Sequence, residues 1–404
     1  GFFSRINGAT RLTLARLEAN GSVDSEFDPA DLGHSLIRSI AVPPDGKIIV
    51  AGDCNYCEGY GLARLNPEGS RDHAFRPDSL GMGSEMASVA VQSDGKVLVA
   101  GLLSDSSWFR RYGVARFNAD GGADAFYLAQ VDSAIRAMVV QPDGKILLGG
   151  YFEFVNGEPR RYVARLNPDG SVDSTFAVSI SQSSGLGGVV GIALQPDGKI
   201  VLVGGFDSVN GVARDRLVRL NPDGSVDPSF VPQAPAGWLY PIALQSNGKI
   251  LCGGPLVEVN GVMRDRLVRF NADGSLDPAF DPEARAEYAF DDPSLEAILV
   301  DDDGGIIVGG HFDHFNGIPH TSLVRLNGDP VPPFFTAQPV SRSRFAGQRV
   351  TFSVTARGGE LSYQWGFNGT AIPGATNTTL TLHTLQPAHA GRYAVTASNS
   401  FGQA

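Results

Sequence analysis

The chain consists of short stretches in which hydrophobic and polar residues alternate, separated by glycine-rich turns. A clear example is "IRAMVVQPDGKILLGGYF", residues 135–152, where two apolar stretches flank the turn Pro-Asp-Gly-Lys. A third stretch, "YVARLN" at 162–167, leads into a second turn, "NPDGS". Alternation over about five to eight residues, bounded by Gly, Pro, Asn and Asp, is typical of β-strands joined by hairpins. The pattern predicts an all-β protein.

The pattern returns six times along the chain. Measured between the glycines of the first turn, the spacings are 49, 49, 54, 50 and 56 residues. Three to four strands in ~40–50 residues is the size of one β-propeller blade. We therefore expect a β-propeller over residues 1–329, and we number its copies repeats one to six. Their first turns lie at 44–47, 93–96, 142–145, 196–199, 246–249 and 302–305.

The two ends of the repeated region are incomplete. Residues 1–27 match only the second half of a repeat, whereas repeat six stops before any segment like "SVDPSF". We call this closing segment of each repeat the tail. A propeller avoids an exposed sheet edge by pairing its chain ends in one blade. The opening residues are therefore expected to supply the missing strand, which favours six blades, with seven blades or removed upstream repeats as alternatives.

Three residue types recur at fixed places near the end of each repeat. A single active site does not need so many copies, and a buried charge must find a partner. We expect the arginines and aspartates to pair or to cap turns, and the phenylalanines to fill gaps between blades. The arginines are Arg16, Arg64, Arg116, Arg165, Arg219, Arg269 and Arg325; the aspartates are Asp24, Asp72, Asp124, Asp173, Asp227 and Asp277; the phenylalanines are Phe27, Phe75, Phe126, Phe176, Phe230 and Phe280.

The second turn has a structural and a metal-binding interpretation. Pro, Asp and Gly suit successive positions of a hairpin turn closed by a left-handed glycine. The alternative is calcium, because "NPDGSVD" offers oxygen ligands at alternate positions. Against calcium, the glycine is in the fourth place rather than the sixth of an EF-hand loop, and the copy "EANGSVD" lacks one aspartate. We expect no cofactor, with calcium as the alternative.

The phrases "QPDGKILLGG", "VNG" and "RLNPDGSVDPSF" together resemble the delta-60 repeat family of bacterial β-propellers. The resemblance covers residues 1 to about 327. It implies a secreted or surface-attached bacterial protein and brings no established activity. Repeats one and two depart from the family pattern because they lack the Asn-Gly pair.

Residues 334–404 have a different texture and look like an immunoglobulin-like β-sandwich. Trp365 stands where the core tryptophan of that fold lies, and Tyr393 resembles its corner tyrosine. The resemblance implies a bacterial variant without the disulfide, because Val354 and Val395 occupy the cysteine positions. The sequence ends where one more strand is expected, so trimming and donation of a strand by a neighbouring chain are both alternatives.

Composition narrows the range of partners. The net charge is −11, from 32 basic and 43 acidic residues that are interspersed, so we expect no nucleic acid partner. Apolar runs such as "KIVLVGG" are far shorter than the ~20 residues that cross a bilayer, so we expect no membrane insertion. Following the family resemblance, we expect an extracellular or cell-surface location.

If the repeated residues form the scaffold, function is expected in the variable connections, on the face opposite the short turns. Aromatic and cationic side chains there suit a glycan or a protein ligand, although loop aromatics also pack down as structure. The candidates are Trp108, Phe109, Arg110, Arg111, Trp238 and Tyr240.

Two further clusters are candidates for other chemistry. The stretch "HFDHFNGIPH" gathers His311, Asp313, His314 and His320, a set of zinc-type ligands, although strand alternation would separate His311 from His314. The stretch "DCNYC" places Cys54 and Cys57 for a small disulfide, a metal half-site or two free thiols. Cys252, in "KILCGG", is expected to be an inert buried thiol.

Three functions are compatible with these observations. The first is a binding or adhesion scaffold for a glycan or another protein. The second is a polysaccharide hydrolase or lyase that uses loop carboxylates such as Asp53, Glu153, Asp207 and Asp313. The third is a structural subunit of a surface fibre, which would self-associate end to end. Familiar catalytic motifs such as GxSxG, HExxH or a phosphate-binding glycine loop do not occur in the sequence.

Overall fold

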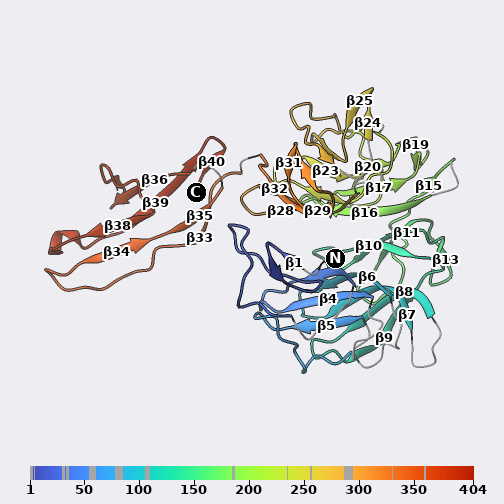
Figure 1. Ribbon diagram of the computed structural model, residues 1–404, viewed down its shortest axis with the longest axis horizontal. Helices are drawn as coiled ribbons and strands as arrows, with labels where there is room; N and C mark the ends of the chain where they lie inside the picture. The colour runs from blue at the N-terminus through green and yellow to red at the C-terminus, as the bar shows by residue number, and fades with distance from the viewer. Residues whose placement is uncertain are drawn as a thin grey trace. The chain divides into compact units, whose positions relative to one another are not determined.

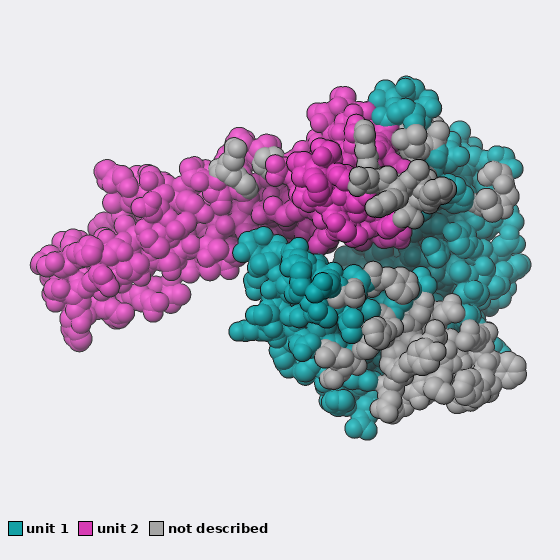
Figure 2. Space-filling view, in the orientation of Figure 1, with its two compact units in different colours: residues 1–242, 257–263, 273–276 teal, residues 243–256, 264–272, 277–404 magenta. Residues whose placement is uncertain are grey.

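The computed structural model describes residues 3, 5–29, 32, 36–53, 61–77, 85–104, 110–183, 187–233, 235–254, 257–285, 294–329, 331–358 and 361–404. These residues form strands and turns, with one short 3-10 turn at Pro387–His389 (Figure 1). The chain divides into two compact units, residues 1–242, 257–263 and 273–276, and residues 243–256, 264–272 and 277–404 (Figure 2). Within the described ranges, no helix is long and apolar enough to cross a membrane.

Each complete repeat contains an antiparallel sheet of three strands, as the sequence pattern predicts. In the order β10–β11–β14, repeat three pairs β10 (Ile135–Val140), β11 (Ile146–Gly150) and β14 (Val163–Leu166). The first turn closes the hairpin with Gly144 at φ +83°, a conformation that suits glycine. The corresponding strands are β16 (Gly188–Leu194), β17 (Ile200–Gly205) and β20 (Leu217–Leu220) in repeat four, and β22 (Ile242–Leu244), β23 (Ile250–Gly253) and β26 (Leu267–Phe270) in repeat five.

The first glycine of the pair Gly204-Gly205 in repeat four has a steric role. In repeat four, a Cβ built on Gly204 would lie 2.0 Å from the backbone oxygen of Gly188 on β16. The pairing of β16 with β17 shifts register between Val189 and Gly191, so β16 bulges toward this point. Glycine is therefore needed where the bulged strand approaches its partner.

Repeats one and two share one sheet in the first unit. A single residue pair, Asp53 opposite Glu85, joins β4 to β6. In repeat two the tail is a full strand, β9, that pairs along β8. The strands of this sheet are β3 (Leu36–Ala41), β4 (Ile48–Asp53), β5 (Leu62–Leu65), β6 (Glu85–Val91), β7 (Val97–Ser104), β8 (Arg110–Phe117) and β9 (Ala123–Gln130).

The Asn-Gly pairs at 7–8, 156–157, 210–211, 260–261 and 316–317 form tight hairpins, where the sequence predicted only variable connections. Each asparagine has φ between 47° and 52° and the following glycine has φ between 72° and 80°, the geometry of a type I′ turn. We call them the Asn-Gly hairpins. In the first unit they are β1 (Arg5–Ile6) with β2 (Ala9–Thr10), β12 (Phe154–Val155) with β13 (Glu158–Pro159), β18 (Ser208–Val209) with β19 (Val212–Ala213), and β24 (Val257–Val259) with β25 (Val262–Arg264), whose last residue belongs to the second unit.

The residues that follow one tail pair with the Asn-Gly hairpin of the next repeat. In the first unit, β15 (Ile180–Ser181) pairs with β18, and β21 (Pro235–Ala236) pairs with β24. The side chain of Asn210 supports this crossing, because its Oδ1 accepts the Ser179 N–H at 2.8 Å. Successive repeats are thus linked through the backbone.

The second unit contains repeat six and the C-terminal domain. Repeat six has the sheet order β28–β29–β32 and a small sheet in which β27 and the Asn-Gly hairpin β30–β31 take part. Its core includes Phe280, Leu295, Phe312 and Phe315. The strands are β27 (Ala284–Arg285), β28 (Ser294–Val300), β29 (Ile306–His311), β30 (His314–Phe315), β31 (Ile318–Pro319) and β32 (Leu323–Leu326).

The C-terminal domain has the core that the sequence predicts. Trp365 is fully buried, lies opposite Val395 and donates its indole N–H to the Asn377 carbonyl at 2.8 Å. The Tyr393 hydroxyl donates to the His389 carbonyl at 2.9 Å, which is the geometry of a tyrosine corner. The strands are β33 (Phe334–Ala337), β34 (Val350–Ser353), β35 (Thr355–Arg357), β36 (Ser362–Phe367), β37 (Thr370–Ala371), β38 (Thr379–Leu382), β39 (Tyr393–Asn399) and β40 (Gly402–Gln403).

The C-terminal domain contains a further short strand, β40, where the sequence predicted that a strand would be lacking. β40 pairs with the end of β39, and two backbone hydrogen bonds of 2.9 and 3.0 Å join Ala397 and Ala404.

Candidate functional site

The recurring arginine and aspartate form an ion pair that also includes the lysine of the first turn. In repeat three, Asp173 Oδ2 accepts Arg165 Nε at 2.7 Å and Lys145 Nζ at 2.8 Å. Asp173 Oδ1 accepts the Thr175 N–H at 2.9 Å, and the guanidinium of Arg165 lies 4.5 Å from the ring centroid of Phe176. We call this arrangement of lysine, arginine, aspartate and phenylalanine the clasp. It holds the tail against the edge of β14.

The expected arginine–aspartate pairing is confirmed from the opening half-repeat to repeat five. The lysine was not predicted, although it precedes the aspartate by 28 residues in repeats two to five and by 25 residues in repeat one. The pairs join Arg16 to Asp24, Arg64 to Asp72, Arg116 to Asp124, Arg165 to Asp173, Arg219 to Asp227 and Arg269 to Asp277, with Nε–Oδ2 distances of 2.6 to 2.9 Å. The lysines are Lys47, Lys96, Lys145, Lys199 and Lys249.

The clasp also connects neighbouring repeats. Arg165 Nη1 donates to the Pro222 carbonyl in the second turn of repeat four at 2.5 Å, and Arg116 Nη1 donates to the Pro168 carbonyl at 2.6 Å. Each arginine therefore binds its own tail and the next repeat. Because the arginine and lysine of the clasp bind carboxylate and carbonyl oxygens of the chain itself, the repeated residues act as scaffold.

The protonation of the aspartates reflects this pairing. Burial alone would raise the pKa of Asp72, yet hydrogen bonds from Lys47, the Ala74 N–H and Arg64 outweigh it and lower the pKa to about 2. The pKa values of Asp173 and Asp227 are lowered as well, since their hydrogen bonds likewise outweigh burial. These carboxylates stay ionised and paired at neutral pH.

The calcium alternative gains no support from the second turn. Asp169 Oδ1 accepts the Ser171 N–H at 3.0 Å and its hydroxyl at 2.6 Å, and Asp173 is engaged in the clasp. Across the described ranges, no three His, Cys, Asp or Glu side chains are grouped so that they could hold a metal ion. The turn oxygens serve the chain's own donors.

The opening half-repeat forms its own contacts within the first unit. Its tail aspartate, Asp24, pairs with Arg16 at 2.6 Å, and Phe27 is buried with Leu14 and Leu65. The tail of the half-repeat is thus bound to its own strand, and completion of repeat six by these residues stays a prediction.

Repeat six replaces the clasp with a different ion pair. It has no tail, and Gly305 stands where the other repeats have lysine. Arg325 Nε donates instead to Asp301 Oδ2 at 2.9 Å, and Arg325 Nη2 to Asp303 Oδ1 at 2.6 Å. Burial, followed by the nearby Asp303, raises the pKa of Asp301, whereas the hydrogen bond with Asp301 lowers that of Asp303.

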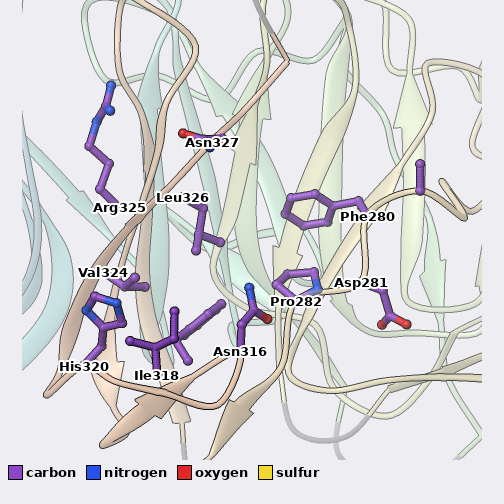
Figure 3. Close-up of a pocket in the computed structure, with 12 residues that line it drawn as sticks. Phe280, Asp281, Pro282, Asn316, Ile318, His320, Val324, Arg325, Leu326 and Asn327 are labelled. Atoms are coloured by element: carbon purple, nitrogen blue, oxygen red, sulfur yellow. The ribbon is translucent and has the colours of Figure 1, made fainter.

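A cavity of about 470 Å³ lies beside this ion pair in the second unit. Figure 3 shows Phe280 and Pro282 on one side and Ile318, His320 and Val324 on the other. Arg325, Leu326 and Asn327 of the β32 segment complete the wall together with Phe315 and Asn316 of the Asn-Gly hairpin.

The predicted aromatic platform is described only in part. Trp108 and Phe109 lie outside the described residues, and of Arg110 only the backbone, at the start of β8, is described. Arg111 is exposed on β8 opposite Leu103. Trp238 is half-buried and Tyr240 is 38% exposed, both just after β21.

The structure does not bring the four predicted metal ligands together. His311 is exposed at the end of β29, whereas His314 Nδ1 contacts Asp313 Oδ1 at 2.8 Å. His320 follows β31 and lines the cavity. Zinc at these residues stays a prediction without geometric support.

The cysteines have different outcomes. Cys54 and Cys57 lie outside the described residues, so their disulfide stays a prediction. Cys252 is fully buried in β23, and burial raises the pKa of its thiol, as expected for an inert cysteine.

Three of the four loop carboxylates named for the enzyme alternative have local partners. Glu153 Oε1 accepts Arg161 Nη2 at 2.5 Å, Asp207 Oδ2 accepts the Ser183 N–H at 2.6 Å, and Asp313 contacts His314. The side chain of Asp53 lies outside the described residues. The partners of these three carboxylates are a neighbouring arginine, a backbone N–H and the adjacent histidine.

The comparisons with known proteins agree with the repeat pattern. The model of the family described as "Domain of unknown function (DUF5122) beta-propeller" matches residues 1–27, 44–75, 92–126, 141–176, 195–230, 245–280 and 302–329. An immunoglobulin domain model matches residues 332–399. No curated protein matches the chain.

Several solved structures are similar at low identity. The extracellular domain of a protein described as a hybrid two component system from B. thetaiotaomicron has 14% identity and a TM-score of 0.43, over 94% of this chain and 55% of its own. The chain thus spans about half the length of that domain. The virginiamycin B lyase from Staphylococcus aureus has 14% identity and a TM-score of 0.44, over 79% of this chain and 91% of its own. A gluconolactonase from Xanthomonas campestris has 14% identity and a TM-score of 0.39, over 68% and 83%.

Likenesses with TM-scores below 0.5 indicate nothing about the activity of this chain. The family models rest on the repeated sequence itself and match more than half of the residues. The chain belongs to the DUF5122 β-propeller family and carries an immunoglobulin domain after its propeller repeats.

Proposed function

We propose that the chain is a binding scaffold, located outside the cell or at its surface, that presents variable side chains to a glycan or another protein. The observation that carries this proposal is the contrast within the Asn-Gly hairpins. Their backbone turn is the same in each copy, with asparagine φ of 47–52°, whereas the residue after the turn, which is exposed in four of the five copies, changes from copy to copy. It is Ala9, Glu158, Val212, Val262 or Ile318.

A scaffold that repeats its backbone and varies its exposed side chains is suited to recognition. The clasps support this role, since they tie the tails to buried strands and leave the hairpin tips free to differ. Exposed apolar side chains at several tips, such as Val212 and Val262, are available as contact area for a ligand.

Trp238 and Tyr240 are the described residues best suited to a sugar. Both follow β21, which is paired with the hairpin strand β24 and thereby fixed. Aromatic rings bind the apolar faces of sugars, and the Tyr240 hydroxyl can donate a hydrogen bond. The net charge of −11 favours a neutral glycan over an acidic one.

A glycan array probed with the whole chain tests the proposal. We expect selective binding that Trp238→Ala and Tyr240→Ala each weaken by about tenfold or more. Phe345→Ala is the matched control, because Phe345 is an exposed aromatic residue of the immunoglobulin domain. Equal binding by all three variants would contradict this assignment. Release of reducing ends or unsaturated sugars would favour the hydrolase or lyase alternative instead.

A further inference from the structure

The strand β32 of repeat six has the same sequence as β20 of repeat four, Leu-Val-Arg-Leu, but a different environment. All four residues of β20 are buried, whereas Leu323 of β32 is 37% exposed. The Arg325 side chain is 46% exposed, compared with 8% for Arg219. Because the strand sequences are identical, the difference comes from what covers them.

In repeat four the cover is the tail. Leu220 forms a β-bridge with Val226, and the Asp227 N–H donates to the Arg219 carbonyl at 2.9 Å. The hairpin asparagine holds the other side of the tail, because Asn210 Nδ2 donates to the Gly224 carbonyl at 3.0 Å. The tail therefore pairs along the edge of β20 on one side and is held by the asparagine of the Asn-Gly hairpin on the other.

In repeat six the corresponding space is the cavity described above. It is lined by Arg325, Leu326 and Asn327 along the β32 edge, and by Asn316 of the hairpin (Figure 3). Asn316 Oδ1 accepts the Glu283 N–H at 2.8 Å, as Asn210 Oδ1 accepts Ser179, but within the described ranges its Nδ2 has no acceptor like Gly224. We call this cavity the groove. It retains the strand edge and the hairpin asparagine that hold the tail in repeat four, but no tail lies between them in the part of the chain that the structure describes.

The charges of the groove differ from those of a complete repeat. In repeat four one tail carboxylate meets two cations, Lys199 and Arg219. In repeat six two carboxylates, Asp301 and Asp303, already meet the single cation Arg325. A Cβ on Gly305 would lie 2.4 Å from Arg325 Nη2, so the guanidinium fills the place of the missing lysine.

Asp301 also occupies the position that a tail aspartate would need. Its Oδ2 accepts Arg325 Nε, the same donor that the tail aspartate takes in the other repeats. Its Oδ1 is buried and has no hydrogen-bond partner among the described residues. A third carboxylate here would be repelled, whereas a donor or a cation would satisfy Asp301.

We infer that the groove along β32 binds an extended segment of a partner protein that has apolar anchors like the tail's valine and phenylalanine but a basic or neutral donor residue in place of its aspartate. The segment adds a strand to the β32 edge, and its backbone carbonyl accepts Asn316 Nδ2. The valine anchor enters the cavity beside Phe280 and Ile318, as Val226 packs against the core of repeat four. This inference does not rest on the proposed function at the loops.

Three labelled peptides test the inference by fluorescence anisotropy with the whole chain. They are NPDGSVKPSFV, NPDGSVNPSFV and the natural tail sequence NPDGSVDPSFV. We expect the lysine peptide to bind saturably, the asparagine peptide more weakly, and the aspartate peptide about tenfold more weakly than the lysine peptide. The absence of saturable binding by all three, or tightest binding by the aspartate peptide, would overturn the inference.

Two variants on the chain locate the binding site. Ile318→Glu replaces an apolar residue of the groove wall that is 59% exposed, so folding is preserved. We expect it to abolish binding of the asparagine peptide, which contains no basic residue that the new carboxylate could attract. The matched control is Val262→Glu, at the same hairpin position of repeat five, where the chain's own tail fills the groove. Loss of binding in both variants, or in neither, would contradict the site.

A third variant tests the charge argument directly. Asp301→Gln installs the residue that repeats two to five carry at this position, as in Gln195. We expect it to weaken the lysine peptide and to strengthen the aspartate peptide, each by about tenfold, so that the preference reverses. An unchanged preference would overturn the role of Asp301. The alternative is that the whole chain binds itself through the groove. If the parent chain self-associates and Ile318→Glu abolishes that self-association, the groove binds a second copy of the chain, and the choice of partner is overturned.

Discussion

Repeats four and six carry the same Leu-Val-Arg-Leu strand, yet one strand is closed and the other open. The difference lies in the tail, which brings Asp227 and Phe230 to Arg219 in repeat four and has no counterpart in the described part of repeat six. The tail, rather than the strand sequence, therefore determines whether the arginine of a repeat is buried. Where the tail is absent, the edge of β32 is left exposed.

The largest expected effect is the loss of a tail aspartate in a closed repeat. Asp227→Ala removes the carboxylate that pairs with both Lys199 and Arg219, and leaves the buried Arg219 guanidinium and the half-buried Lys199 ammonium without it. Removing one partner of a buried pair costs about 3–5 kcal/mol. We expect urea denaturation to show a loss of this size. A loss below that of Asp223→Ala, an exposed turn aspartate of the same repeat, would contradict the clasp.

The tail phenylalanine should be nearly as important. Phe230 is fully buried, and the guanidinium of Arg219 lies 4.6 Å from its ring centroid. Truncation of a buried phenylalanine costs about 3–5 kcal/mol, and Phe230→Leu should recover much of it because the volume is largely kept. Thermal unfolding of the two variants measures the difference. Equal melting temperatures for Phe230→Ala and the parent chain would exclude the packing role of the tail.

Acid should weaken the closed repeats. The pKa of Asp72 is lowered to about 2 in the folded state. Its pairing therefore stabilises the fold fully at pH values above the ordinary aspartate pKa of about 3.9. This contribution, about 2 kcal/mol, is lost as the pH falls through the folded pKa. Asp301 acts in the opposite sense, because its pKa is raised and its contribution is lost as the pH rises.

The urea midpoint measured between pH 5 and pH 2 tests the sign. We expect stability to fall over this range and to fall less in Asp72→Asn, which lacks the titrating carboxylate. A steeper fall in the variant than in the parent would show that the sign is wrong.

The smallest expected effect belongs to the open repeat. Arg325 forms its ion pairs at a half-exposed position, where such pairs contribute about 0–1 kcal/mol. Arg325→Ala should therefore shift the urea midpoint much less than Arg219→Ala does. Equal shifts in the two variants would remove the distinction between the closed and open repeats.

The repeated parts of the molecule were predictable from the sequence, because periodicity reveals them. The six first turns predicted the hairpins, and the recurrence of Arg219 with Asp227 predicted their pairing. Trp365 and Tyr393 likewise indicated the immunoglobulin-like core. In each of these cases local patterns and long-range contacts agree.

The parts that were missed depend on short or unique contacts. The Asn-Gly hairpins have strands of only two or three residues, too short for an alternation pattern to reveal. The histidine cluster was dense in sequence, but His311 and His320 lie on different elements. The groove of repeat six results from the absence of a tail. Its charge depends on Asp301, which replaces the glutamine of repeats two to five, and the pairing of Asp301 with Arg325 could not be predicted from the sequence.

Native-state hydrogen exchange of β20 and β32 tests the central claim most directly. The two strands have identical sequences, so their intrinsic exchange rates are closely matched and only their surroundings differ. If the tail closes each repeat, the amides of Leu217–Leu220 exchange far more slowly than those of Leu323–Leu326. Equal protection of the two strands would contradict the account.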